Sequence, residues 1–348
     1  MRLFLIDPHE KRLYNNGLFD TGLDPNFIVW KRIRSYLAKK NIEIATIDLH
    51  PIETAERIYF LDHDFFSLKP GRPSYYLQKC IEASIPKSQL HLVITECPII
   101  KPESWLPENH TYYGTIYTWN DSLIDNKKYF HYRWVQNLNG IQKNVPAFSE
   151  KKLLTLINAH KTNYNPKELY SLRIQAIRFY EKHYPEDFDL YGIGWNKPLN
   201  IKFVYSVLKG NFMKVPKFIM DFALSYKGYS SYKGAVEDKI EVMRKYKFSL
   251  CFENMENIDG YITEKIFDSL KAGTIPVYLG AQNIQKYIPK GAFVDFRNFS
   301  GFEELTNYLI DMKEEEYHSF IDARNSFLKM GIEQWDYKHF AEDIFLHE

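Results

Sequence analysis

A glutamate and a lysine, Glu264 and Lys265, stand side by side where the sequence pattern predicts that a helix begins. Apolar residues at helical spacing follow them, and Gly273 fits the position where such a helix stops. The first turn of a helix offers free backbone N–H groups and the positive end of the helix dipole, which attract phosphate. An acid is common there, whereas a lysine is unfavourable unless an anion neutralises it. From the residues alone, the pair is either an ordinary charged helix start or part of a phosphate site.

The elements around this helix determine where the pair lies. Its predicted range, 261–273, stands between two hydrophobic runs, 247–252 and 275–280, that are typical of buried strands. Open parallel sheets bind ligands at the carboxyl ends of their strands, which is where a helix that follows a strand begins. We therefore expect Glu264 and Lys265 at such an edge.

Strand and helix patterns alternate along the whole chain, which is typical of doubly wound parallel sheets. In the first half we expect strands at 2–7, 42–49, 57–62, 90–96 and 111–119, and helices at 27–40 and 74–85. In the second half we expect strands at 152–159, 188–192, 247–252, 275–280 and 292–296, and helices at 166–184, 236–246, 261–273, 283–288 and 301–312. A last helical segment runs to the C-terminus.

The stretch 120–150 is polar and aromatic without a clear period, and we place a domain boundary near its end. The length of 348 residues agrees with two domains of about 150 residues each. We predict an α/β domain at 1–150, a second α/β domain at 151–325, and a helical segment at 326–348 that packs back on the first domain. The predicted fold class is α/β, with two Rossmann-like domains facing across a cleft.

Composition argues against several classes of protein. The net charge of +1 provides no global field that would attract nucleic acid. The sequence contains no run of about 18 apolar residues, so it predicts no transmembrane span. The apolar part of MRLFLIDPHEKR is too short for a signal peptide. The three cysteines, Cys80, Cys97 and Cys251, are too widely spaced for a disulfide framework or a metal knuckle. We therefore expect a cytoplasmic protein.

The stretch 201–233 carries six lysines and a single acid, with apolar residues interleaved. A basic amphipathic segment can lie on an anionic membrane surface, which would make the protein peripheral to an inner membrane. The alternative is a solvated helix packed on its own domain. The sequence leaves both open, and it does not indicate an oligomeric state.

One long stretch, 245–296, carries a recognisable pattern. It reads KYKFSLCFENMENIDGYITEKIFDSLKAGTIPVYLGAQNIQKYIPKGAFVDF and closely resembles the α-1,3/1,4-fucosyltransferases of glycosyltransferase family 10. Weaker matches follow the family's order upstream. Glu96-Cys97-Pro98 is similar to its Glu-Ser-Pro, 119–124 to its Arg-x-Asp-Ser-Asp-Ile, and 169–183 followed by 189–192 to its arginine helix and Tyr-Gly strand end. Cys97 and Met255 depart from the usual family residues.

The resemblance implies a bacterial-type enzyme that transfers L-fucose from GDP-β-L-fucose to a glycan hydroxyl with inversion. It also implies the two-domain GT-B architecture, with the acceptor bound by the first domain and GDP-fucose by the second. By similarity, Glu96 is the general base, Glu264 contacts the fucose and Lys265 contacts the diphosphate. The other expected donor-site residues are Arg173 on the phosphates (with Arg178 as its rival), Asn254 and Tyr261 lining the pocket, Tyr191 and Gly192 near guanine, and Glu253 as either a donor ligand or a structural strand-end acid.

These implied roles agree with the chemistry of such a transfer. The leaving diphosphate has a low pKa, so it needs cations rather than a general acid. The attacking hydroxyl loses one proton, which a single carboxylate can accept. The resemblance implies no required metal cofactor and leaves stimulation by Mn²⁺ or Mg²⁺ open. It implies a GlcNAc or Glc hydroxyl of a lactosamine-type, lactose-type or O-antigen glycan as acceptor, with α-1,3 or α-1,4 linkage undetermined.

Two alternatives remain at the level of sequence. Asp62-His63-Asp64 follows a predicted strand and is similar to the acid pair that holds Mn²⁺ in metal-dependent glycosyltransferases of another fold. A catalytically inactive carbohydrate-binding relative is the second alternative. The joint presence of Glu96 with the Glu264-Lys265 pair argues against inactivity, and loss of activity in excess chelator would favour the metal-dependent class.

Overall fold

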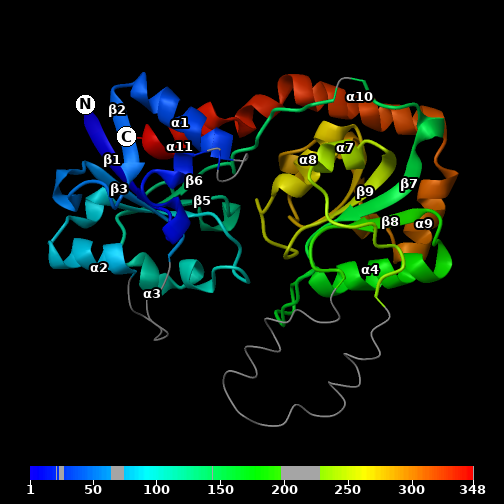
Figure 1. The fold of residues 1–348 in the computed structure, drawn as a ribbon, viewed down its shortest axis with the longest axis horizontal. Helices are drawn as coiled ribbons and strands as arrows, with labels where there is room; N and C mark the ends of the chain where they lie inside the picture. The colour runs from blue at the N-terminus through cyan, green and yellow to red at the C-terminus, as the bar shows by residue number, and fades with distance from the viewer. Residues whose placement is uncertain (21, 23–26, 64–73, 143, 197–227, 348) are drawn as a thin grey trace, which may run out of the picture. The chain divides into compact units, whose positions relative to one another are not determined.

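The computed structural model describes residues 1–20, 22, 27–63, 74–142, 144–196 and 228–347 (Figure 1). These residues form two compact units, each built on one parallel sheet. The first unit comprises Met1–Asn139, Ile258–Tyr261 and Met330–Glu348, and the second comprises Gly140–Asn257 and Ile262–Lys329. The prediction of two Rossmann-like α/β domains is confirmed. The chain passes between the units at four places rather than at one boundary near residue 150.

The described strands of the first unit form a parallel sheet in the order β2-β1-β3-β4-β5-β6. Such strands are largely apolar because parallel sheets are covered on both faces. The edge strand β6 was not predicted, because its three partly exposed residues contain no apolar run. The strands are β1 (Arg2–Asp7), β2 (Ile42–Thr46), β3 (Arg57–Leu61), β4 (Leu90–Ile94), β5 (Thr115–Thr118) and β6 (Tyr129–His131).

The helices of the first unit come from both ends of the chain. They are α1 (Ile28–Ala38), α2 (Tyr75–Glu82), α3 (Pro107–His110) and α11 (Tyr337–Phe345). The last of these, α11, packs beside α1, where the rings of Trp30 and Phe340 lie 5.7 Å apart (Figure 1). The C-terminal segment therefore completes the core of the first unit.

The described strands of the second unit form a parallel sheet in the order β11-β10-β9-β7-β8. The strands are β7 (Lys152–Ile157), β8 (Phe188–Tyr191), β9 (Tyr246–Phe252), β10 (Ile275–Leu279) and β11 (Val294–Asp295). The helices are α4 (Tyr170–His183), α7 (Lys239–Met243), α8 (Glu264–Ala272), α9 (Phe302–Asp311) and α10 (Glu314–Met330).

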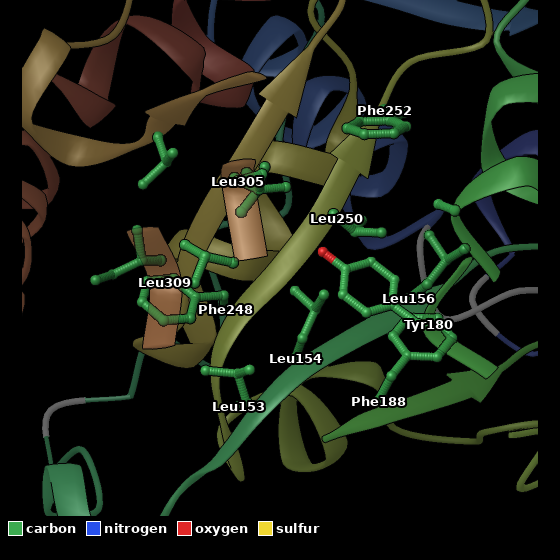
Figure 2. Close-up of a cluster of buried hydrophobic side chains, with 14 of the residues drawn as sticks. Leu153, Leu154, Leu156, Tyr180, Phe188, Phe248, Leu250, Phe252, Leu305 and Leu309 are labelled. Carbon is green, nitrogen blue, oxygen red and sulfur yellow. The ribbon is translucent and has the colours of Figure 1, made fainter. Parts of the chain in front are cut away.

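Helices cover both faces of this second sheet. Figure 2 shows one side, where apolar residues of β7 and β9 meet Tyr180 of α4 and Leu305 of α9. On the other side, Met243 of α7 and Ala272 of α8 pack with Ile157 of β7. Because α8 connects the parallel neighbours β9 and β10, its first turn lies at the carboxyl end of β9. The fold thus places the helix start where the sequence predicted it.

Two sequence expectations differ from the structure or lie outside it. The helix expected at 283–288 is only a 3-10 turn at Ile284–Lys286, and Pro289 stops its continuation. Of the basic stretch 201–233, residues 201–227 lie outside the described residues. Among the helices that are described, none combines the length and the apolar character needed to cross a bilayer.

Candidate active site

A buried arginine holds the segment that follows β9. Arg173 of α4 is 2% exposed, and its Nη2 donates to the carbonyl oxygens of Phe252 and Glu253, both at 2.6 Å. The same nitrogen lies 3.2 Å from the side-chain oxygen of Asn254. The structure therefore brings three expected site residues together, and Arg173 fixes the place of Asn254. A contact of Arg173 with phosphate stays a prediction, and its rival Arg178 is exposed and paired with Glu181.

Glu253 is fully buried and links β9 to the segment before α8. Its carboxylate accepts from the backbone N–H of Thr263 at 2.8 Å and from the Thr263 hydroxyl at 2.6 Å. Burial raises the pKa of Glu253, against the lowering effect of the Lys265 ammonium 3.3 Å away. This geometry favours the structural alternative for Glu253 over the donor-ligand alternative.

Gly280 at the end of β10 makes room for this carboxylate. A Cβ atom at residue 280 would lie 2.5 Å from Cγ of Glu253 and 2.6 Å from the hydroxyl of Tyr278. The sequence pattern offers Thr263 as a cap of the helix that begins at Glu264, and Thr263 is the N-cap residue, but its hydroxyl binds Glu253 rather than the helix backbone. Neither this contact nor the role of Gly280 was predicted from the sequence, although both residues lie inside the stretch that resembles family 10. Their roles become visible only when Glu253 is seen buried between them.

Lys265 lies in the first turn of α8 with its ammonium largely buried. Its Nζ is 2.9 Å from the Thr263 hydroxyl oxygen and 3.4 Å from Glu264, and its side chain is 13% exposed. Burial alone would lower the pKa of Lys265, but the carboxylates of Glu264 and Glu253 outweigh it and raise the pKa. Desolvation likewise opposes the ionisation of Glu264, yet the Lys265 ammonium lowers the pKa of Glu264 to about 2. Both groups are therefore charged at neutral pH.

The two remaining residues expected near the donor lie at the end of β8, which β7 separates from β9. Gly192 has φ of +126°, and a Cβ atom there would lie 2.0 Å from the carbonyl oxygen of Asn158. The hydroxyl of Tyr191 lies 2.9 Å from that of Tyr246, the first residue of β9. The structure therefore does not bring the Tyr191 hydroxyl to the end of β9 that carries Glu253.

In the first unit, the expected base Glu96 follows β4 and is partly exposed. Its carbonyl oxygen accepts from the indole nitrogen of Trp105 at 3.0 Å, and the carbonyl oxygen of Thr95 accepts from Trp119 at 3.2 Å. The backbone on both sides of the Glu96 side chain is thus held by tryptophans. Such rigid support is what a positioned general base requires.

Asp62 holds the same turn from the neighbouring strand. Its buried carboxylate accepts from the backbone N–H groups of Thr95 at 3.0 Å and Glu96 at 3.3 Å, and also from the hydroxyls of Thr95 and Ser104. Burial raises its pKa, and these hydrogen bonds oppose that rise. Asp64 lies outside the described residues, and within those described no cluster of His, Cys, Asp and Glu is arranged to hold a metal ion. The geometry assigns Asp62 to supporting the Glu96 turn.

Tyr261 belongs to the first unit although it stands only three residues before Glu264. It is buried, and its ring lies 4.8 Å from that of Trp119. Gly260 has φ of +79°, and a Cβ atom there would lie 2.0 Å from the carbonyl oxygen of Trp119. Tyr261 therefore packs beside the Glu96 turn, and its expected place in a donor pocket stays a prediction.

Known proteins resemble the C-terminal part of this chain. The family model described as "Glycosyltransferase family 10 (fucosyltransferase) C-term" matches residues 216–345. An α-(1,3)-fucosyltransferase of Helicobacter pylori is 40% identical over 74 residues, which cover 21% of this chain and 15% of that protein. Human α-(1,3)-fucosyltransferase 4 is 34% identical over 102 residues, 28% of this chain and 19% of that protein. The alignments thus span less than a quarter of these relatives' length.

Solved structures resemble the chain over nearly its whole length. A crystal structure of an α1,3-fucosyltransferase with GDP has a TM-score of 0.51 at 14% identity, covering 97% of this chain and 87% of that one. An Anabaena protein in complex with UDP and glucose has a TM-score of 0.54 at 11% identity, covering 99% and 98%. These similarities show the fold alone, which is the two-domain GT-B fold. Within this fold, residues 216–345 match the model of the C-terminal part of the family 10 fucosyltransferases, and the relatives that share sequence with this chain are fucosyltransferases.

Proposed function

We propose that this protein is an inverting fucosyltransferase that uses GDP-β-L-fucose as donor. The observation that carries the proposal is the charged Lys265 ammonium at the first turn of α8, held by Thr263 and Glu253 at the carboxyl end of β9. Free N–H groups of a helix start and a fixed cation together suit a diphosphate. The match of residues 216–345 to the family 10 model and the fucosyltransferase names of the relatives support the same donor.

The proposed reaction is a single displacement. An acceptor hydroxyl oxygen forms a bond to the anomeric carbon of fucose while the bond from that carbon to the β-phosphate oxygen breaks. GDP leaves with the electron pair, and Lys265 and the N–H groups of α8 stabilise its charge. Glu96 takes the hydroxyl proton. Glu264 contacts the fucose, since its side chain is 49% exposed whereas that of Glu253 is buried.

The two units divide the substrates in this proposal. The second unit binds GDP-fucose, and the first unit binds a GlcNAc or Glc residue of a glycan, joined through an α-1,3 or α-1,4 linkage. No residue in the proposed steps requires a metal ion. Activity that survives excess chelator supports this mechanism, and complete loss with recovery on adding Mn²⁺ contradicts it.

A donor panel tests the proposal directly. The protein is given GDP-fucose, GDP-mannose or UDP-galactose with a lactosamine acceptor, and the released nucleotide and the glycoside are both quantified. We expect transfer from GDP-fucose alone, with an α-configured product. Preference for a UDP-sugar would overturn the proposal.

Replacement of the proposed diphosphate ligand tests the donor site. Lys265→Ala should weaken GDP binding by about 2–4 kcal/mol, in the range of a lost charge-stabilising donor. Lys182→Ala, which replaces an exposed lysine of α4, is the matched control.

A further inference from the structure

A buried arginine binds the end of α8 that lies opposite the proposed donor site. Arg324 of α10 donates from Nε to the carbonyl oxygen of Leu270 at 2.6 Å and from Nη2 to that of Lys271 at 3.1 Å. The same Nη2 lies 3.0 Å from the carbonyl oxygen of Gln142. One guanidinium therefore joins the last carbonyls of α8 to a segment more than a hundred residues away in sequence.

The charge of Arg324 is balanced by carbonyl dipoles. Its side chain is buried, and within the described part of the chain it forms no ion pair with a carboxylate. Nη1 completes its contacts with the side-chain oxygen of Asn325 at 2.6 Å. Burying a guanidinium is costly unless hydrogen bonds and an opposing field compensate. The C-terminal end of α8 supplies both, since its carbonyls carry the negative end of the helix dipole.

Further contacts keep the same helix end in place. The N–H of Gln142 donates to the carbonyl oxygen of Lys271 at 2.9 Å, and Nζ of Lys151 donates to that of Gly273 at 2.5 Å. With only nine residues at about 1.5 Å per residue, α8 moves as a short rigid rod. A displacement at its C-terminal end therefore reaches its first turn.

We propose that Arg324 is a positioning residue for the donor diphosphate, acting through α8 on Lys265. This inference rests on the proposed donor role of Lys265. The ammonium of Lys265 lies 3.3 Å from the carboxylate of Glu253, which directly follows β9 and is not part of α8. A shift of α8 along its axis would therefore change the position of Lys265 relative to Glu253 and to any bound diphosphate.

The test compares GDP binding, donor KM and kcat in Arg324→Ala and Arg324→Lys. We expect the GDP Kd of Arg324→Ala to rise about tenfold, because ångström-scale misplacement of a binding group has effects of this order. Arg324→Lys should lie between this variant and the parent, and millimolar methylguanidinium should restore GDP binding to Arg324→Ala. The acceptor KM should not change.

Two further variants make the outcome decisive. Leu305→Ala removes a buried side chain of α9 in the same unit without touching α8, so it should lower the Tm and leave the GDP Kd unchanged. Lys265→Ala tests the donor site itself. If Lys265→Ala loses GDP affinity while folded Arg324→Ala binds GDP like the parent, the positioning role is wrong and the proposed function stands. If Lys265→Ala keeps full GDP affinity, the donor site is wrong as well. Should Arg324→Ala not fold, parent-like GDP affinity in Arg324→Lys overturns the inference.

Discussion

The two glutamates beside Lys265 differ in burial, and this difference separates their roles. Glu253 is fully buried and accepts two hydrogen bonds from Thr263. Glu264 has a half-exposed side chain, and its carboxylate lies 3.4 Å from the Lys265 ammonium. A buried, saturated carboxylate positions its neighbours, whereas an exposed and ionised one remains accessible to a ligand. Glu264 is therefore the better candidate for contact with a sugar.

Replacing the proposed base should separate chemistry from donor binding. We expect Glu96→Gln to lower the transfer rate by about 10²–10⁴-fold, the usual contribution of a general base. The GDP Kd should not change, because Glu96 lies in the first unit and Lys265 in the second. The measurements are initial rates of fucoside formation and calorimetric titration with GDP. Glu108→Gln, an exposed glutamate of α3, is the control, and parent-like transfer by Glu96→Gln would exclude Glu96 as base.

Lys151 predicts a pH dependence of stability. Burial, aided by the charges of Arg324 and Arg244, lowers the pKa of Lys151 from 10.5 to about 7. Between these two values the unfolded chain binds a proton that the folded protein does not, so the free energy of unfolding rises with pH in this window. The neutral amine can still donate to the carbonyl oxygen of Gly273.

Replacement of this lysine should remove that dependence. We expect the stability of Lys151→Met relative to the parent to be greatest near pH 6.5 and to decline towards pH 9.5. Urea unfolding curves across this range provide the measurement. Lys182→Met on the exposed face of α4 should follow the parent at every pH, and an equal pH slope in Lys151→Met and the parent would contradict the lowered pKa.

At the scale of the element, the two ends of α8 have different roles. Its first turn carries the charged residues of the candidate site, and its last turn is anchored by Arg324 and Lys151. Gly273 ends the helix in the left-handed conformation, with φ of +73°, as the sequence predicted. These contacts on the last turn are the basis of the proposal that α8 presents Lys265 in a fixed place.

A side chain at residue 273 should weaken this anchor. We expect Gly273→Ala to lower the free energy of unfolding by about 1–2 kcal/mol, because alanine is strained at positive φ. Its Cβ would also lie 2.4 Å from Cγ2 of Val145, which would have to move. Chemical unfolding followed by tryptophan fluorescence measures the loss. Gly301→Ala is the matched control, since open space surrounds that position, and equal stability of the two variants would refute the explanation.

At the scale of the whole molecule, the first unit depends on the C-terminal end of the chain. Phe340 of α11 is buried against Trp30 of α1 at 5.7 Å and against Tyr132 at 5.5 Å. A chain that passes four times between its units cannot be divided into two independent pieces at one peptide bond.

Loss of the Phe340 ring should therefore act mainly on the first unit. We expect Phe340→Ala to destabilise it by about 3–5 kcal/mol, the usual cost of emptying a buried aromatic site. Limited proteolysis should then cleave first within residues 1–139, while GDP binding by the second unit persists. Leu106→Ala, an exposed leucine, should leave the proteolysis pattern of the parent unchanged. First cleavage within the second unit would contradict the claim that Phe340 mainly stabilises the first unit.

The sequence by itself determined the elements and the most informative stretch. Apolar periodicity located β1, β4, β7 and β9, and the pattern from Glu264 to Gly273 located both ends of α8, because these signals lie within a few neighbouring residues. The same stretch carries the resemblance to family 10. The sequence pattern did not predict β6, and it predicted a helix at 283–288 where the structure has only a 3-10 turn at Ile284–Lys286. Both elements are too short to carry a clear pattern of their own.

Only the tertiary structure decided which side chains support the candidate site. Arg173 meets Phe252 and Glu253 across about eighty residues of sequence, and Asp62 meets Thr95 and Glu96 across more than thirty. Hydrogen bonds of this kind depend on how strands and helices pack, and no local pattern records them. The placement of Tyr261 in the first unit and the binding of Arg324 to α8 have the same origin. The residues that can do chemistry can thus be identified from short stretches of the sequence, whereas their geometry is set by contacts between distant parts of the chain.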